Sequence, residues 1–169
     1  MMINGFHSLP GQTGTTLIEV LVSLLILSVG LLGMAGLQTV SLRNTQAAYQ
    51  RTQATLSAQD MMERMRANPQ GVNSGAYNNA GSAISAACMS ATGCSAGALA
   101  LHDVAEWQAA LLAALPAGTG VVCLDSTPQD GTPAAPACDG SGTLYAIKIW
   151  WDANRDGTAN QLLAMSAFL

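Results

Sequence analysis

Residues 14–42 read GTTLIEVLVSLLILSVGLLGMAGLQTVSL, and this stretch decides the fold. Between residues 20 and 42 there is no charged residue. As a helix this run would be about 34 Å long, which is enough to cross the hydrocarbon core of a bilayer, about 30 Å thick. The sequence therefore predicts one membrane-spanning segment close to the N-terminus.

The residues before the apolar run predict a short leader that is removed. Residues 1–14 are polar, contain glycine and proline, and end in Gly14. An ordinary secretory signal has its small-residue cleavage site after the apolar run. Here the nearest such site precedes the run, so we expect the apolar segment to remain in the mature protein.

The helix predicted for the apolar run continues well beyond it. No proline occurs between residues 11 and 68, and small or apolar residues recur at helical spacing, at Ala47, Ala54, Ala58, Met61 and Met65. We expect one helix of about fifty residues, about 75 Å long at 1.5 Å per residue. It should end at the Asn68-Pro69 step, because a residue before proline is disfavoured in the helical region.

Three glycines interrupt the apolar run at intervals of three, at Gly30, Gly33 and Gly36. Each costs about 1 kcal/mol relative to alanine in a helix interior, which favours bending there. Small residues at close spacing also favour helix packing in a membrane. Both interpretations remain open.

The residues after the long helix predict a small α+β unit. A loop with short elements is expected over residues 71–100, followed by a helix whose capping box is formed by Asp103 and Glu106. The apolar face of that helix would consist of Trp107, Leu111, Leu112 and Leu115. Short antiparallel strands are expected at residues 121–124, 144–151 and 161–168. We expect this second helix to pack on the sheet that these strands form.

Four cysteines follow the apolar run: Cys88, Cys94, Cys123 and Cys138. None belongs to a CxxC pair and the chain has only two histidines, which favours disulfides over a metal site and an oxidising compartment. Four cysteines allow three connectivities. Pairing Cys88 with Cys94 and Cys123 with Cys138 closes the shortest loops, so we predict that pairing.

Composition argues against nucleic-acid binding and against catalysis. The net charge is −4 and no basic patch is present. His102 lies beside Asp103, but no nucleophile elbow, metal-ligand cluster or phosphate loop accompanies them. We therefore expect His102 to be an exposed residue next to a helix cap, and we expect neither enzymatic activity nor a cofactor.

A weak calcium candidate follows the second predicted strand. Asp152, Asn154, Asp156 and Asn160 stand at positions one, three, five and nine of a calcium loop. Position twelve, where a bidentate glutamate is expected, is Leu163. We therefore favour a polar hairpin turn and predict no metal site.

Several motifs together resemble a known family. The segment GTTLIEVLV at residues 14–22 resembles the processing site of type IV prepilins, in which glutamate is the fifth mature residue. The motif MERMRAN at residues 62–68, the Trp107 helix and VCLD at residues 122–125 extend the resemblance to PilV-type minor pilins. The resemblance covers most of the chain and implies the pilin fold, a long N-terminal helix carrying a small antiparallel sheet.

The resemblance implies processing and assembly. A prepilin peptidase of the bacterial inner membrane would cleave after Gly14, and the new N-terminal amine of Thr15 would be methylated. The family usually has phenylalanine or methionine at this first mature position. Partners would be other minor and major pilins and a tip adhesin, in a complex that primes or caps the pilus. The alternative is a minor pseudopilin of a type II secretion system, which has the same leader and helix.

Glu19 is the residue with the clearest implied role. A carboxylate in an apolar environment is costly unless it meets a positive partner, and in a pilus the N-terminal ammonium of a neighbouring subunit can be that partner. Alternatively, Glu19 lies in the headgroup region of an ordinary anchor.

The expected organisation has three parts. These are a leader at 1–14, a long helix at 15–68 that spans the inner membrane to about residue 42, and a periplasmic head at 69–169 that later enters the pilus, or fimbrium. The leader contains no lysine or arginine, so the cations nearest the span are Arg43 and Arg51. With the head outside the cytoplasm, both lie on the wrong side for the positive-inside rule.

Overall fold

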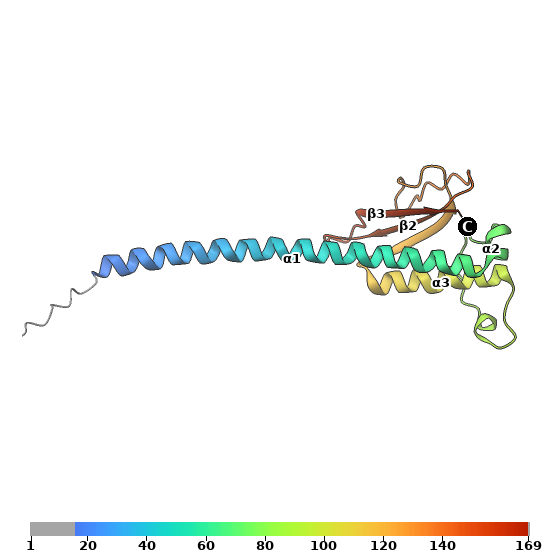
Figure 1. Ribbon diagram of the computed structural model, residues 1–169, viewed down its shortest axis with the longest axis horizontal. Helices are drawn as coiled ribbons and strands as arrows, with labels where there is room; N and C mark the ends of the chain where they lie inside the picture. The colour runs from blue at the N-terminus through green and yellow to red at the C-terminus, as the bar shows by residue number, and fades with distance from the viewer. Residues whose placement is uncertain (1–15, 169) are drawn as a thin grey trace, which may run out of the picture. The chain divides into compact units, whose positions relative to one another are not determined.

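The computed structural model describes residues 16–168 and has four helical and three strand elements (Figure 1). They are α1 (Leu17–Ala67), α2 (Pro69–Asn73), the 3-10 helix η1 (Ala86–Met89), α3 (Ala96–Ala114), β1 (Thr119–Leu124), β2 (Tyr145–Trp151) and β3 (Gln161–Ala167). The chain divides into two compact units, one ending at Asn44 and one beginning at Thr45, which we call the head. The α+β fold expected from the sequence is confirmed.

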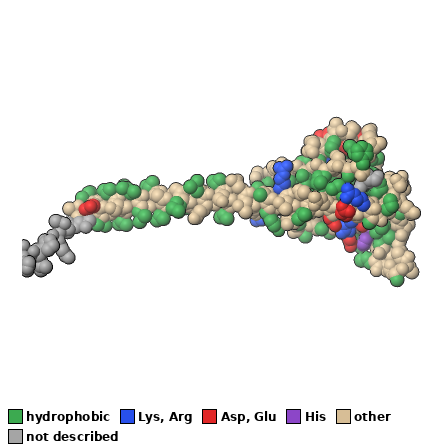
Figure 2. Space-filling view, in the orientation of Figure 1, with side chains coloured by type: hydrophobic (Ala, Val, Ile, Leu, Met, Phe, Trp, Pro, Cys, Tyr) green, Lys and Arg blue, Asp and Glu red, His purple; other side chains and the backbone are tan. Residues whose placement is uncertain are grey.

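The first unit consists, in its described part, of the apolar section of α1. Its hydrophobic side chains are exposed along its length (Figure 2), and α1 is long and apolar enough to cross a membrane. The hydroxyl of Ser23 donates to the carbonyl of Glu19, and that of Ser28 to the carbonyl of Leu25, each at 2.7 Å. These bonds satisfy the hydroxyls within the helix, so they need no partner from outside.

The long helix ends where the Asn68-Pro69 step predicts. Asn68 has left the helical region, and its side-chain oxygen accepts a hydrogen bond from the backbone N–H of Gly71, which caps α2. A Cβ on Gly71 would lie 2.4 Å from the Asn68 amide nitrogen, so this close turn requires glycine. The cap therefore fixes the direction in which the chain leaves α1.

The head is built around a three-stranded antiparallel sheet of order β1-β2-β3. The central strand β2 is buried on both faces. Its core face carries Tyr145, Ile147, Ile149 and Trp151. The three predicted strands are confirmed, with ends that differ by one or two residues.

The core of the head joins α1, α3 and the sheet. The buried residues of α1 are Gln50, Ala54, Ala58, Met61 and Met65, spaced to line one helical face. In Figure 1 α3 runs alongside this part of α1, and α3 also contacts β1 of the sheet. Met61 and Met65 therefore belong to the core of the head.

Trp107 joins the three elements of this core. Its indole N–H donates to the carbonyl of Ser57 on α1 at 2.9 Å. Its ring lies against Gly120 of β1, where an added Cβ would be 2.4 Å from the ring. A side chain at position 120 would therefore displace Trp107 from the core.

Three expectations about the second helix are wrong. The helix begins at Ala96, not at Asp103, because the Ser95 hydroxyl caps the N–H of Ala98 and starts the helix earlier. His102 is consequently a buried residue inside α3, not an exposed one beside a cap. Leu112 is 68% exposed, because one residue beyond Leu111 the helix has turned by about 100° away from the core.

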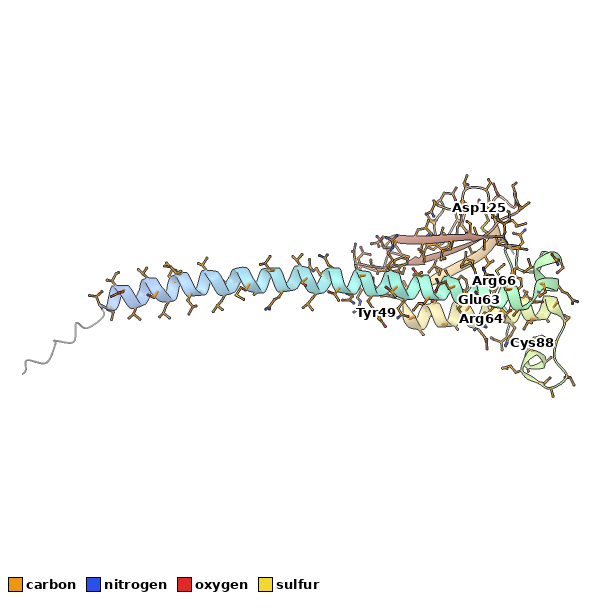
Figure 3. The ribbon with its side chains drawn as sticks, viewed as in Figure 1. Tyr49, Glu63, Arg64, Arg66, Cys88 and Asp125 are labelled. Carbon is orange, nitrogen blue, oxygen red and sulfur yellow. A yellow bond between two sulfur atoms is a disulfide. The ribbon has the colours of Figure 1, made fainter. Side chains whose placement is uncertain are left out.

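Both predicted disulfides are formed. Cys88 joins Cys94 around η1, and Cys123 at the end of β1 joins Cys138. In Figure 3 Cys88 lies in a loop that projects from the head, well separated from Asp125 beyond the sheet. The two bridges therefore close separate loops.

Candidate functional site

Glu19 stands in the first turn of α1 with its side chain exposed. It is the only acidic residue between the described start of the chain and Asp60, and no side chain among residues 16–168 forms an ion pair with it. The start of a helix favours a negative charge by a few tenths of a kcal/mol to about 1 kcal/mol. That is small beside the cost of an unpaired carboxylate in an apolar environment. Glu19 is therefore suited to a cationic partner from another molecule.

The other residues of the expected processing site are Gly14 and Thr15. Both lie outside the described residues, so cleavage and methylation there stay predictions.

Arg64 fastens α1 to α3. Its guanidinium lies 2.9 Å from Asp60 on its own helix, and 2.9 Å from Glu106 and 3.5 Å from Asp103 on α3. Burial opposes the charged form, but the bonds with Glu106 and Asp60 outweigh it and raise the pKa of Arg64. Arg64 therefore remains a cation that ties the two helices together.

A second, buried polar network starts at Asn68. The Asn68 amide donates to the Tyr77 hydroxyl at 3.1 Å and to the carbonyl of Ala96 at 2.8 Å. The Tyr77 hydroxyl donates in turn to the Asp103 carboxylate at 2.5 Å. Burial, and then this bond to Asp103, raise the pKa of the Tyr77 hydroxyl.

The two networks show what the residues of the motif at 62–68 do in the head. Arg64 and Asn68 are four residues apart, so they lie on the same side of the chain and both reach Asp103 directly or through Tyr77. Met61 and Met65 meanwhile fill the core. Sequence reasoning missed Tyr77, which lies in a Gly- and Asn-rich segment without periodicity.

A buried lysine holds the loop that Cys123–Cys138 closes. Lys148 is 0% exposed, and its ammonium lies 2.5 Å from Asp125 and 2.8 Å from Asp130, and donates to the carbonyl of Pro136 at 2.8 Å. Burial opposes its charge, but the bonds to the two aspartates raise the pKa of Lys148. The only sequence signal was a lone lysine in the apolar run YAIKIWW.

His102 of α3 holds the start of η1, at Ser85. Its Nδ1 accepts a hydrogen bond from the backbone N–H of Ser85 at 3.2 Å, and its Nε2 lies 3.4 Å from Glu106. This arrangement requires an unprotonated Nδ1. The role of His102 is therefore to hold a loop, which its position beside Asp103 did not indicate.

The calcium candidate residues lie together in the β2–β3 turn. Asp152 accepts hydrogen bonds from the backbone N–H groups of Asn154 at 3.1 Å and Gly157 at 2.7 Å. Burial opposes its ionisation, but these backbone bonds outweigh it and lower the pKa of Asp152. Asp156 and Asn160 likewise accept backbone N–H groups within the turn. Across residues 16–168, no group of three or more His, Cys, Asp or Glu side chains could hold a metal ion.

Comparison with known proteins adds two family matches. Residues 9–35 match the prokaryotic N-terminal methylation motif, and residues 36–105 match the family described as type IV pilin Tt1218. The comparisons with curated proteins and with solved structures each gave no match. The first match contains Glu19 and the second contains Arg64, Asn68 and Tyr77. The two matched regions adjoin, so over residues 9–105 the chain is similar to type IV pilins, and its long apolar helix and small antiparallel sheet agree with the fold of that family.

Proposed function

We propose that this chain is a type IV pilin and, within that family, a minor pilin, a structural subunit that helps to prime or cap the pilus. The observation that supports the proposal is the junction at residues 62–68, where the motif that resembles PilV-type minor pilins holds α3 against α1 through Arg64 and Asn68. Both residues of this motif join α1 to α3, which supports the proposal because the resemblance then rests on residues that organise the head.

The proposed route begins in the inner membrane. The prepilin peptidase removes residues 1–14 by cleaving after Gly14, and the amine of Thr15 is then methylated. The apolar section of α1, residues 17–42, lies in the bilayer, while the head folds in the periplasm, where its two disulfides can form.

Assembly moves α1 from lipid to a bundle of pilin helices. The exposed side chains of residues 17–42 supply the packing surface, and Glu19 meets the N-terminal ammonium of a neighbouring subunit. The partners are other minor and major pilins and, at the tip, an adhesin. Removing one member of a buried ion pair of this kind costs roughly 3–5 kcal/mol, because the other charge remains buried without a partner.

The amount of the chain in pili tests the minor role. Quantitative mass spectrometry of sheared pili should find this chain far below one copy per copy of the major pilin. Deletion of the gene should sharply reduce surface pili counted by electron microscopy, and the gene supplied in trans should restore them. Equal abundance with the main component of the pilus would make this chain a major pilin.

The same deletion tests the alternative of a minor pseudopilin. If pili are unchanged and protein secretion through the outer membrane is lost, the chain belongs to a type II secretion system. The two assays use the same strain, so one experiment decides between the two machines.

A further inference from the structure

The segment around η1, residues 81–94, is held to the rest of the head by few contacts. We call it the η1 segment. No residue from 78 to 99 is buried, so the segment has no side chain in the core. Among the described residues, two hydrogen bonds join it to α3, each at 3.2 Å. The N–H of Ala83 donates to the carbonyl of Leu101, and the N–H of Ser85 donates to Nδ1 of His102.

His102 is the part of this attachment that can change with pH. The residue is buried, and its Nδ1 accepts from Ser85 while its Nε2 lies 3.4 Å from Glu106. A neutral imidazole has one N–H and one acceptor nitrogen, so Nε2 carries the proton in this arrangement. A second proton must therefore go to Nδ1, the atom that holds Ser85. An unperturbed histidine takes up its second proton at about pH 6.5.

The charged groups around the ring come from the two helices. On α3, Glu106 lies beside Nε2 and Asp103 is the next residue in the chain. Arg64 of α1 contacts both of these carboxylates. Asp60 of α1 also pairs with Arg64, and the Tyr77 hydroxyl donates to Asp103. Three carboxylates thus share one guanidinium, and this excess of negative charge favours a charged ring, whereas the N–H of the η1 segment favours a neutral one.

We propose that protonation of His102 releases the η1 segment from α3. The added proton turns Nδ1 from an acceptor into a donor, which then faces the donor N–H of Ser85. Residues 67–101 include no charged side chain, so no carboxylate of the segment can pair with the new charge. Glu106 still accepts from Nε2 and keeps the charged ring in place. Ser85 must therefore move away.

The release changes the surface of the head and leaves its core intact. The Cys88–Cys94 bridge closes within the segment, so the segment keeps its own loop when it leaves α3. Cys88 marks it in Figure 3, where it projects from the head, and Ile84 and Met89 are exposed on it. The pH outside the head thus sets the position of this loop. The inference concerns the head alone, so it holds for a minor pilin, a major pilin or a pseudopilin.

NMR spectroscopy of the full chain in nanodiscs, titrated from about pH 8 to about pH 5, tests the proposal. The ring nitrogens of His102 should show that Nδ1 gains a proton, and the Ser85 amide signal should shift with the same midpoint. Protection of the Ser85 amide against hydrogen exchange should fall about fivefold, because a typical hydrogen bond changes an equilibrium by about that factor. The amides of β2 should not change, since the core stays folded.

Three variants separate the hydrogen bond from the titration. His102→Asn has an acceptor oxygen as far along the side chain as Nδ1 but does not titrate, so it should hold Ser85 at both ends of the pH range. His102→Leu has no acceptor and should release Ser85 throughout. Glu106→Gln should leave the segment held at about pH 8 and move the transition to lower pH by a few tenths of a unit, because an exposed ion pair contributes little.

Four results would overturn the proposal. Two concern the unmodified chain: His102 remains neutral at about pH 5, or it takes up the proton while the Ser85 signal stays unchanged. The third is a transition in His102→Asn like that of the unmodified chain. The fourth is a change of the β2 amides together with Ser85, because the whole head would then be unfolding.

Discussion

The two sections of α1 share one backbone geometry and differ in where their side chains find partners. Between Leu17 and Leu42 the hydrophobic side chains are exposed, and Glu19 has no cationic partner among residues 16–168. In the head the same helix buries Ala54, Ala58, Met61 and Met65, and Arg64 is paired three times. Among residues 16–168 the side chains of the first section therefore lack partners, which our proposal assigns to lipid and to other subunits, whereas the second section finds its partners within its own chain.

We expect the largest effect from a substitution of Glu19, whose proposed partner is the N-terminal ammonium of a neighbouring subunit. Glu19→Ala should be inserted and processed normally, because insertion depends on the apolar run and cleavage on Gly14. It should nevertheless be missing from sheared pili, because the unpaired ammonium of the neighbouring subunit costs roughly 3–5 kcal/mol. Immunoblots of membranes and of sheared pili measure the two outcomes separately.

Gly14→Arg is the matched control for Glu19→Ala. It should stay in the membrane in the uncleaved form, so a processing defect and an assembly defect give different band sizes. Normal incorporation of Glu19→Ala would contradict the charge pairing and would favour the headgroup position of an ordinary anchor.

The second prediction compares the same residue type in the two sections. Met61→Ala should lower the free energy of unfolding of the head by about 2–5 kcal/mol, because it opens a cavity in the core. Met34→Ala, at a position 60% exposed, should leave that free energy unchanged. Chemical denaturation in detergent, followed by tryptophan fluorescence, reports on the head because all three tryptophans lie there. Equal losses for both variants would mean that the two sections do not have separate sources of stability.

The features that could be predicted from the sequence are those with local signals. The long helix, its end at Asn68, the three strands and the disulfide pairs were predictable, because periodicity, proline and loop length are local signals. The start of α3 was not, since Ser95 and the Ala- and Gly-rich turn after it resemble the loop that precedes them. The roles of Tyr77 and Lys148 depend on partners far away in sequence, which local patterns do not contain.

The third prediction concerns the two disulfide loops of the head. Replacing Cys123 and Cys138 by serine should cost about 3 kcal/mol, and replacing Cys88 and Cys94 somewhat less, because the shorter loop loses less chain entropy. Unfolding curves of the two variants measure the difference. Non-reducing peptide mapping of the unmodified chain provides the control, and a Cys94–Cys123 bridge would contradict the pairing.

The fourth prediction concerns acid. The bond to Arg64, opposed by burial, lowers the pKa of Glu106, so the folded head binds this proton less tightly than the unfolded chain does. The stabilisation is therefore present above the ordinary pKa near 4.5 and is lost as the pH falls through the lowered pKa. Glu106→Gln should make the free energy of unfolding less sensitive to pH between about 5 and 3. The difference should be well under 1 kcal/mol, because the pair is exposed. An unchanged pH profile would show that the Glu106–Arg64 pair does not contribute to stability.

The smallest effect is expected at the β2–β3 turn, where we predict calcium to bind weakly or not at all. The Asp152 carboxylate already accepts the N–H groups of Asn154 and Gly157, and Leu163 supplies no oxygen at the position where a bidentate glutamate is needed. Calorimetry of the full chain should show no micromolar affinity. Asp152→Ala should instead lower the stability of the turn with or without calcium, because it leaves backbone donors without an acceptor. Micromolar affinity that Asp152→Ala abolishes would show that this turn, like the first section of α1, is completed only from outside the chain.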